Sequence, residues 1–418
     1  MKPMKVLMLS KEYPPNVYGG AGVHVNYLAR TLGELMEVEV RCFGDQNSKR
    51  DKLRVRGFSG RLDSPDTAGN NRENNEPSVR KARQFNRVLQ PMATDLSIVN
   101  QPIEADIIHA HTWYTFLAGF LGKQLYDLPL VTTVHSLEPL RPWKREQLGN
   151  GYRLSSWMEK TGLENSDRVI AVSRAMKEDI VKYYEVEKKR VEIIYNGIDL
   201  NQYQYTEKTH RIEEFGVDPE QPYALFVGRI TRQKGIIHFM EAIKHIREDL
   251  QIVLCAGAPD TDEIEQEMTS RVNHLQQERG NIIWINQMVD KETVIQLYSQ
   301  AEVFVCPSIY EPFGIINLEA MACRTPVVAS AIGGIKEVVV HGETGLLVEF
   351  TPQGEQDNEP ADPAAFARGL ARGVNTLMDD PELRQQMKDN GRQRVEEKFS
   401  WSRIAARTRD LYQELAGL

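Results

Sequence analysis

Two fixed cations follow a short apolar segment in the middle of the chain. Gly228 and Arg229 come directly after residues 224–227, and Lys234 stands five residues beyond Arg229. Cations on a loop at the end of a strand can neutralise a departing diphosphate, a task that otherwise needs a divalent metal ion. We therefore predict that Arg229 and Lys234 bind phosphates without a metal; the alternative is a solvated basic turn.

Two carboxylates stand eight residues apart further along the chain. Glu311 follows the apolar residues 303–306 on a loop, and Glu319 lies about one turn inside the helix predicted after it. Carboxylates in such positions can hold vicinal hydroxyl groups through charge-assisted hydrogen bonds. We predict that this pair binds the hydroxyls of a sugar and a ribose rather than lying on a solvated helix face.

A glycine-rich turn follows the first predicted strand. Gly19, Gly20 and Gly22 open a helical pattern directly after that strand's loop. Glycines let the backbone approach an anion closely, and the start of a helix favours negative charge. A diphosphate fits such a turn, although glycines here can also serve tight packing. The run does not match the dinucleotide-binding G-x-G-x-x-G pattern.

Histidines stand at the ends of predicted strands in the first half of the chain. A histidine in this position is more often structural than catalytic, but its context favours His135 as a functional residue. We expect His109 and His111 to alternate across the two faces of the sheet and not to chelate one metal. The run Asp260-Thr261-Asp262 resembles a metal-binding D-x-D motif, but such matches are frequent by chance. No metal site is predicted.

The whole chain has the size and composition of a two-domain globular protein. Its 418 residues are too many for one ordinary core, and 41% are hydrophobic and 26% charged. No apolar run approaches the ~20 residues of a membrane span, and the apolar run near the N-terminus is too short for a signal peptide. We therefore expect a cytoplasmic protein. The net charge of −8 argues against binding to nucleic acid or anionic membranes.

Two local features of the composition lead to further expectations. The four cysteines are scattered singly in apolar segments, which predicts buried reduced thiols. Residues 45–87 carry eleven Lys or Arg against six Asp or Glu and few large apolar residues. We interpret this stretch as a mobile polar loop. The alternative is a basic flap near a phosphorylated or polyanionic acceptor.

Short apolar strands alternate with helical patterns in two series. We predict strands at residues 6–9, 38–43, 106–109, 130–134, 169–172 and 191–194, and again at 224–227, 252–256, 282–285, 303–306, 327–329 and 345–348. This alternation predicts an α/β fold with two doubly wound, Rossmann-like domains, whose ligands bind beyond the carboxyl ends of the strands. We assign residues 1–200 to the first domain, 201–222 to a linker, 223–398 to the second domain and 399–418 to a helix packing back across the junction. We expect the two domains to face each other across a cleft.

Together these motifs resemble glycosyltransferase family 4 in its two-domain GT-B architecture. The resemblance rests on the Glu311-to-Glu319 spacing, the Gly228-Arg229 and Lys234 motif and the glycine turn, and it covers nearly the whole chain. More narrowly, residues 11–25 and 135–144 resemble the actinobacterial type of ADP-glucose glycogen synthase, a group that includes α-maltose-1-phosphate synthase. This group transfers glucose to α-glucan or to glucose 1-phosphate.

The resemblance implies a role for each matching residue. Arg229 and Lys234 would bind the donor diphosphate, Glu311 the donor sugar and Glu319 the ribose, and His135 would lie beside the glucosyl ring. The remaining donor contacts would come from the glycine turn and from Gly228, Asn196, Gly333, Gly334 and Ile335. No cofactor is implied, because ADP-glucose is a substrate.

The acceptor side is less well defined by the resemblance. Arg141, Lys144 and Arg145 follow soon after His135 and could receive the phosphate of glucose 1-phosphate, unless they form a solvated surface loop. Lys11 and Tyr13 are weaker acceptor candidates. Residues 59–76 match no motif.

We therefore predict a retaining glucosyltransferase of glycogen biosynthesis. It would form α-1,4 bonds on α-glucan or on glucose 1-phosphate with ADP-glucose as donor. One alternative is a UDP- or GDP-sugar-dependent transferase with another small or lipid acceptor. The other is a catalytically silent sugar-nucleotide-binding protein. The sequence leaves open the acceptor, the nucleotide base and whether the chain forms a homo-oligomer.

Overall fold

The computed structural model describes residues 3–17, 19–60, 62, 77–141, 143–354 and 357–417. Chain contacts divide it into two compact units. Unit 1 consists of residues 1–197 and 401–418, and unit 2 of residues 198–400. Among the described residues, no helix is both long and apolar enough to cross a bilayer.

Unit 1 is built on an eight-stranded sheet with the order β3-β4-β2-β1-β5-β6-β7-β8. All neighbouring strands are parallel except β3 and β4, which are antiparallel. The strands are β1 (Lys5–Ser10), β2 (Glu37–Phe43), β3 (Asn47–Arg50), β4 (Leu53–Phe58), β5 (Ile107–His111), β6 (Leu130–Val134), β7 (Arg168–Ala171) and β8 (Val191–Ile193).

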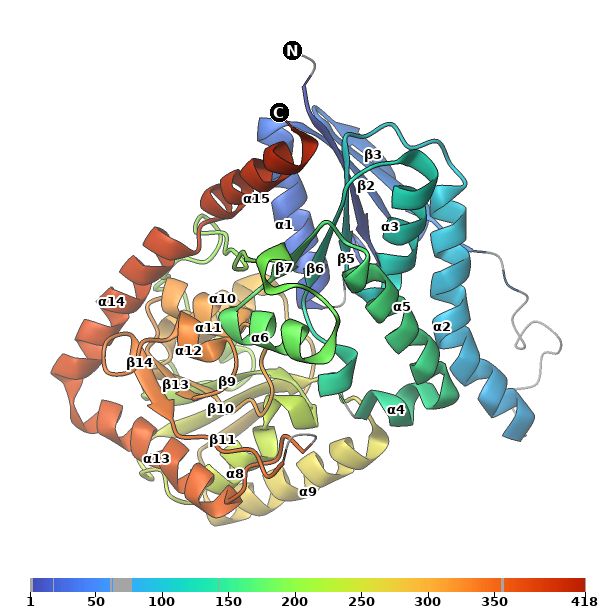
Figure 1. Ribbon diagram of the computed structural model, residues 1–418. Coiled ribbons are helices and arrows are strands. Elements are labelled where there is room, and N and C mark those ends of the chain that lie inside the picture. Colours follow the sequence, from blue (N-terminus) through green and yellow to red (C-terminus); the bar gives the residue numbers. More distant parts are fainter. Residues whose placement is uncertain are drawn as a thin grey trace. The chain divides into compact units, whose positions relative to one another are not determined.

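Helices cover both faces of this sheet (Figure 1). They are α1 (Gly20–Leu35), α2 (Pro77–Val99), α3 (Trp113–Tyr126), α4 (Trp143–Leu148), α5 (Tyr152–Glu164), α6 (Arg174–Tyr183) and α15 (Trp401–Ala416). Helices α1 and α15 lie side by side and pack on the face formed by alternate strand residues such as Val6 and Met8. Because successive side chains of a strand point to opposite faces, this alternation aligns one apolar surface for the two helices.

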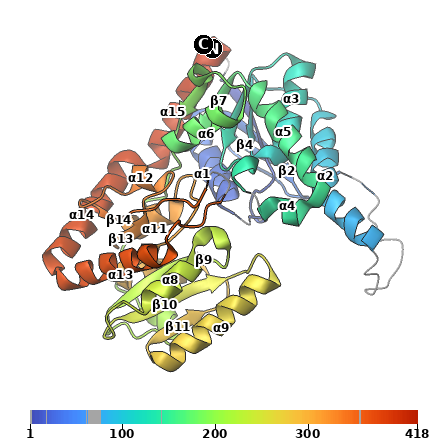
Figure 2. The same ribbon diagram turned by 60° about the horizontal axis from the view of Figure 1, so that its bottom comes forward.

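Unit 2 is built on a six-stranded parallel sheet with the order β11-β10-β9-β12-β13-β14. Its strands are β9 (Tyr223–Arg229), β10 (Gln251–Gly257), β11 (Ile282–Ile285), β12 (Val303–Cys306), β13 (Val327–Ser330) and β14 (Gly345–Val348). Its α-helices are α7 (His210–Glu213), α8 (Ile236–Ile243), α9 (Asp262–Glu278), α10 (Lys291–Gln300), α11 (Ile315–Ala322), α12 (Ile335–Val338), α13 (Pro363–Asp379) and α14 (Pro381–Lys398). Figure 2 shows α9 alongside β11.

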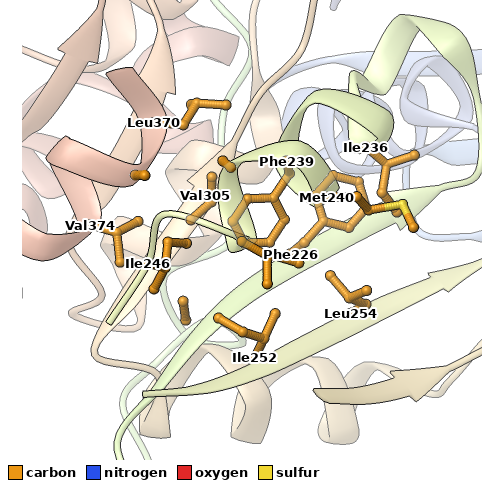
Figure 3. Close-up of a cluster of buried hydrophobic side chains, with 14 of the residues drawn as sticks. Phe226, Ile236, Phe239, Met240, Ile246, Ile252, Leu254, Val305, Leu370 and Val374 are labelled. Atoms are coloured by element: carbon orange, nitrogen blue, oxygen red, sulfur yellow. The ribbon is translucent and has the colours of Figure 1, made fainter. Parts of the chain in front are cut away.

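The core of unit 2 forms where α8, α9 and α13 cover one face of the sheet. Phe226 of β9 and Phe239 of α8 are at most 1% exposed, and their ring centroids are 6.4 Å apart. Figure 3 shows them among Met240, Ile252 and Leu254. Burying such side chains stabilises a fold by about 1.5–3 kcal/mol each, so this cluster holds the strand ends firmly in place.

The structure confirms the predicted α/β class with two Rossmann-like units. Each of the twelve predicted strands overlaps an observed one. The four cysteines are buried and none forms a disulfide, as predicted. The predicted linker, residues 201–222, lies inside unit 2 and contains α7.

The mobile-loop interpretation of residues 45–87 is wrong for the part that the structure describes. This stretch contains β3, β4 and the beginning of α2. Val55 and Phe58 are buried, while β3 at the sheet edge is exposed throughout. An edge strand with charged side chains lacks the apolar run that reveals a central strand. Residues 61 and 63–76 lie outside the described residues, and with them most of the 59–76 stretch.

Candidate active site

The residues of unit 2 that are predicted to bind phosphate and sugar lie where the strand order of the sheet reverses. Strand β9 continues to β10 on one side, whereas β12 lies on its other side. In an open parallel sheet the loops that follow two such strands diverge and leave a crevice at their carboxyl ends. The loop after β9 carries Lys234, and the loop after β12 carries Glu311.

Lys234 and Glu311 form an ion pair in this crevice. The Lys234 Nζ donates to Glu311 Oε2 at 2.7 Å, and the two side chains are 21% and 10% exposed. Burial lowers the pKa of Lys234, but the adjacent Glu311 charge and hydrogen bond offset this effect and leave the pKa above its ordinary value. Lys234 is therefore a permanent cation at neutral pH.

The local sequence fixes this lysine through capping and a glycine. Thr231 caps the short 3₁₀ turn Arg232–Lys234 by accepting a hydrogen bond from the Lys234 N–H. Gly235 has a φ of 63°, and a Cβ there would lie 1.9 Å from the Pro307 carbonyl oxygen. Only glycine permits this left-handed conformation and close approach, which joins the β9 and β12 loops.

Arg229 reaches a different partner. Its Nη1 contacts Asp260 Oδ1 at 2.8 Å. Thr261 caps α9 by accepting from the Ile264 N–H, and Asp262 is the first residue of that helix. The D-x-D run therefore makes an ion pair and a helix start.

The loop after β13 packs against the backbone of Glu311. The Gly334 N–H donates to the Glu311 carbonyl at 3.0 Å. Gly333 has a φ of 49°, and a Cβ there would lie 2.2 Å from the same oxygen. Ile335 is fully buried at the start of α12. Gly333 and Gly334 thus lie beside the Glu311 backbone, and Ile335 follows them directly.

Glu319 is held by two tyrosines. Its Oε1 accepts from Tyr203 Oη at 2.9 Å and its Oε2 from Tyr298 Oη at 3.3 Å. Burial raises the pKa of Glu319, and the two hydroxyl donors act against that shift. Tyr203 belongs to the stretch predicted as a linker, so that stretch supports the carboxylate instead.

In unit 1 the strand order reverses between β1 and β5. His111 ends β5, His135 directly follows β6, and His24 lies on α1. The His111 Nδ1 and His135 Nε2 atoms are 3.3 Å apart, and the ring centroids of His24 and His135 are 4.7 Å apart. Asn196, which follows β8, is buried beside His24.

These imidazoles are neutral at physiological pH. Burial lowers the pKa of His24 to about 4, although Asn196 acts against the shift. Burial and the neighbouring histidines lower the pKa of His111 and of His135 well below the ordinary value. A neutral imidazole can donate or accept one hydrogen bond without carrying a charge.

The expected alternation of His109 and His111 across the sheet is wrong. Their ring centroids are 4.1 Å apart, because residues two apart in a strand share a face. His109 is nevertheless structural. Its Nδ1 lies 2.5 Å from Tyr412 Oη and its Nε2 lies 2.7 Å from Thr133 Oγ1.

The glycine turn at the start of α1 surrounds an internal carboxylate. The Gly19 N–H donates to Glu12 Oε2 at 2.7 Å, and a Cβ on Gly22 would lie 2.7 Å from the Glu12 Cβ. Lys11 and Glu12 also line a cavity of about 560 Å³ with Pro15, Asn16, Val17, Phe43 and Gly44. Gly20 is the first residue of α1.

The two weaker acceptor candidates differ in exposure. Lys11 Nζ lies 3.9 Å from the Tyr114 ring centroid, and burial lowers the pKa of this lysine. Tyr13 is only 5% exposed and packs in the core of unit 1, where burial raises its pKa to about 12.

The three basic residues after His135 have three different neighbours. Arg141 donates to Ser136 Oγ at 3.3 Å, Lys144 donates to Gln147 Oε1 at 2.8 Å, and the Arg145 guanidinium lies 5.2 Å from the Tyr152 ring centroid. Their intervening residue Pro142 lies outside the described residues.

Two buried glutamates, Glu138 and Glu159, are joined by a hydrogen bond next to this basic segment. Glu159 Oε1 accepts from the Glu138 N–H at 2.9 Å and from Tyr184 Oη, while Ser155 Oγ donates to Glu138 Oε2 at 2.9 Å. Burial, and next the charge of Glu138, raise the pKa of Glu159 to about 8. Glu159 therefore holds a proton at neutral pH.

Comparison with known proteins matches both units to one enzyme class. Residues 18–202 match the family model described as Glycosyltransferase Family 4, and residues 207–394 match Glycosyl transferases group 1. The chain is 44% identical to α-maltose-1-phosphate synthase of Mycolicibacterium smegmatis, over 99% of this chain and 100% of that protein. It belongs to glycosyltransferase family 4.

More distant members of the class agree with this assignment. A glycogen synthase of Mycobacterium tuberculosis is 29% identical over 98% of this chain and 94% of that protein. The catalytic domain of starch synthase IV from Arabidopsis thaliana, solved with ADP and acarbose, superposes with a TM-score of 0.74 at 17% identity, covering all of both chains. This likeness confirms the GT-B fold.

Sequence reasoning missed several residues that lie near the predicted site residues. His24 stood in the recognised segment after the glycine turn, and His111 was set aside through the alternation error. Tyr203 and Glu159 gave no local signal, because their roles depend on contacts 116 and 21 residues away in the sequence. The two-residue spacing of His109 and His111 was the one signal that could have exposed the histidine cluster.

Proposed function

We propose that the protein is an α-maltose-1-phosphate synthase that transfers glucose from ADP-glucose to glucose 1-phosphate with retention of configuration and without a metal ion. The observation that carries the proposal is the Lys234–Glu311 pair at the crevice between β9 and β12. The 44% identity over the full length of a relative with that name supports the choice of acceptor.

In this proposal unit 2 binds the donor through the loops after β9 and β12. Lys234 and Arg229 stabilise the diphosphate as the bond from its oxygen to the anomeric carbon breaks. Glu311 accepts hydrogen bonds from the glucosyl hydroxyls, with Gly333 and Gly334 beside it. Glu319 accepts from the ribose hydroxyls in place of Tyr203.

The acceptor hydroxyl attacks the same face of the sugar from which the diphosphate departs. A new carbon–oxygen bond forms as the old one breaks, and the acceptor proton passes to the departing diphosphate oxygen. The products are α-maltose 1-phosphate and ADP. His135, neutral at the carboxyl end of β6, hydrogen-bonds the glucosyl ring as positive charge develops on it. Arg141, Lys144 and Arg145 receive the acceptor phosphate.

A second acceptor is supported by the glycogen synthase relative. The same chemistry on the end of an α-glucan chain would elongate glycogen. The two functions share the donor site and differ only in what the acceptor offers, a phosphate or further glucose units.

The deciding experiment measures ADP release and product with ADP-glucose as donor and a chelator present. Glucose 1-phosphate and glycogen are offered in parallel, and UDP-glucose replaces ADP-glucose in a matched set. Rapid formation of maltose 1-phosphate from ADP-glucose supports the proposal. Transfer to glycogen alone identifies a chain-elongating synthase, and a rate that disappears with the chelator contradicts metal-independent transfer.

A further inference from the structure

Three histidines of unit 1 converge from three separate elements. His24 lies on α1, His111 at the end of β5 and His135 directly after β6. One ligand nitrogen from each lies within 4.8 Å of those of the other two. Their convergence is fixed by the sheet, because β5 and β6 are hydrogen-bonded neighbours with Ala110 opposite Thr132 and His111 opposite Thr133.

Two of the three histidines lie at hydrogen-bonding distance from each other, which is also the spacing of two ligands of one metal ion. The His111 Nδ1 and His135 Nε2 atoms are 3.3 Å apart. A tetrahedral zinc ion with bonds of about 2.0–2.1 Å to nitrogen separates its ligands by about 3.3–3.4 Å. The His24 ligand nitrogen lies within 4.8 Å of both atoms, so it is the third candidate ligand.

The hydrogen bonding of the cluster separates these three histidines from His109. Both nitrogens of His109 have partners, Tyr412 and Thr133. In contrast, neither nitrogen of His24 and not the Nε2 of His111 has a partner at hydrogen-bonding geometry among the described residues, although both side chains are at most 3% exposed. Buried polar atoms are normally satisfied, so unpartnered ones call for an explanation.

An internal explanation is available and must be tested. Asn196 lies close enough to favour a protonated His24, yet its Oδ1 also lacks a partner at hydrogen-bonding geometry. A small rotation would pair the two side chains. That contact would satisfy one nitrogen of His24 and leave its other nitrogen available to a metal ion.

We propose that His24, His111 and His135 form a binding site for a divalent transition metal ion such as Zn²⁺, and that the bound ion inhibits transfer by occupying His135. The inhibitory part rests on the proposed function, whereas metal binding does not. Three imidazoles and a water in the fourth position suit Zn²⁺, Co²⁺, Ni²⁺ or Cu²⁺. Mg²⁺ and Ca²⁺ prefer oxygen ligands and should not bind.

The surroundings of the trio predict a reversible site. His135 is half-buried, so the cluster opens toward solvent at this residue. Structural metal sites usually fix their histidines through a second hydrogen bond from the other ring nitrogen. For His24 the candidate partner is the Asn196 side chain, whose Oδ1 has no partner at hydrogen-bonding geometry among the described residues. The site should therefore release its metal to a chelator.

The test is a titration of the full chain with Co²⁺ and Zn²⁺ in the absence of substrates. Co²⁺ should give the visible absorption of a tetrahedral complex, and Zn²⁺ should displace it, whereas Mg²⁺ should not. His111→Gln and His24→Gln should weaken binding by at least the 10–100-fold that loss of a supporting partner costs. His245→Gln, at an exposed position on unit 2, is the matched control and should bind as the wild type does.

Because His24 and His111 are buried, their variants are checked for folding by circular dichroism. His135→Gln changes a half-buried side chain and provides the same test if the others fail to fold. Wild-type affinity in a folded His111→Gln or His135→Gln variant overturns the site, as does the absence of Co²⁺ absorption in the wild type.

The inhibitory step is tested separately with the transfer assay. Zn²⁺ should abolish ADP release in the wild type, and a chelator should restore it. Metal binding without inhibition overturns the blocking role of His135. Metal binding to a protein that releases no ADP under any condition would refute the proposed function and leave the metal site standing.

Discussion

The polar groups of the two candidate sites are kept in opposite states. In unit 2, Lys234 pairs with Glu311 at 2.7 Å and Arg229 pairs with Asp260 at 2.8 Å. In unit 1, His24, His111 and His135 have no ionic partner among the described residues, and burial lowers the pKa of each and keeps it neutral. Paired ions can exchange an internal partner for a phosphate, whereas neutral rings can hydrogen-bond a sugar without a strong charge. This difference matches the separate roles that the proposed function gives the two units, with the leaving diphosphate assigned to unit 2 and the reacting sugar to unit 1.

The largest effect on activity is expected when Lys234, a partly buried cation of unit 2, is removed. Lys234→Ala should lower kcat by about 10²–10³-fold, because a fixed charge that stabilises the departing diphosphate is lost. The substitution also removes the ion-pair partner of Glu311, so folding is checked by circular dichroism. The measurement is ADP release with saturating glucose 1-phosphate.

Lys244→Ala provides the control for that variant. Lys244 is 43% exposed and pairs with Glu241 on the surface, so its loss should leave kcat unchanged. Wild-type activity in Lys234→Ala would show that the paired ions of unit 2 are structural and do not stabilise the leaving group.

A smaller effect is expected from the neutral site. His135→Ala should lower kcat by about 100-fold, since one hydrogen bond to the reacting sugar is lost, while the affinity for ADP stays constant. Calorimetric titration with ADP measures the second quantity, and His274→Gln at an exposed position is the control. Parallel loss of ADP affinity would mean that unit 1 also handles the leaving group.

The acceptor segment should respond in a more selective way. Lys144→Ala and Arg145→Ala should each raise the KM for glucose 1-phosphate about tenfold through loss of a charge-assisted contact. Transfer to glycogen, measured in the same preparation, should keep its KM. If the KM for glucose 1-phosphate is unchanged, the acceptor phosphate is bound elsewhere.

The last prediction concerns the buried acid Glu159 and the pH dependence of Tm. Glu159 has its pKa raised from 4.5 to about 8 by burial, so the folded chain keeps a proton that the unfolded chain loses between these values. Its contribution to stability is therefore present below pH 4.5 and is lost as the pH rises toward 8. The glutamine of Glu159→Gln cannot ionise. The Tm of this variant should therefore fall less than that of the wild type as the pH rises over this interval.

Thermal unfolding at several pH values in this interval measures the effect. Glu178→Gln, an exposed residue on α6, should follow the wild-type curve. Equal slopes for Glu159→Gln and the wild type would show that Glu159 is ionised in the folded protein.

The sequence predicted the fold best where a run of apolar residues had a single physical explanation. Central parallel strands are buried on both faces, so runs such as residues 252–256 and 303–306 could be located from apolar residues alone. That Lys234 and Glu311 lie on loops after strands was predictable for the same reason, but that β9 and β12 are neighbours in the sheet was not. The direct contact of the two side chains was not predictable either, since it depends on the register of two loops.

The remaining features depend on contacts distant in the sequence. Strand β3 is polar because it lies at the sheet edge, and residues 201–222 are polar although Tyr203 reaches Glu319. The carboxylate of Glu12 at the glycine turn illustrates the same difficulty. The turn predicts an anion, but not that the protein supplies one itself. The roles of the individual site residues stay predictions.

Helix α15 gives unit 1 an unusual folding order. Trp401, Ile404 and Tyr412 of this helix complete the core around α1, and Tyr412 holds His109. These residues are synthesised only after the whole of unit 2. Unit 2 is contiguous in sequence and can close first, while unit 1 waits with one apolar face exposed. The unit that begins the chain therefore cannot complete its core until the other unit has been synthesised.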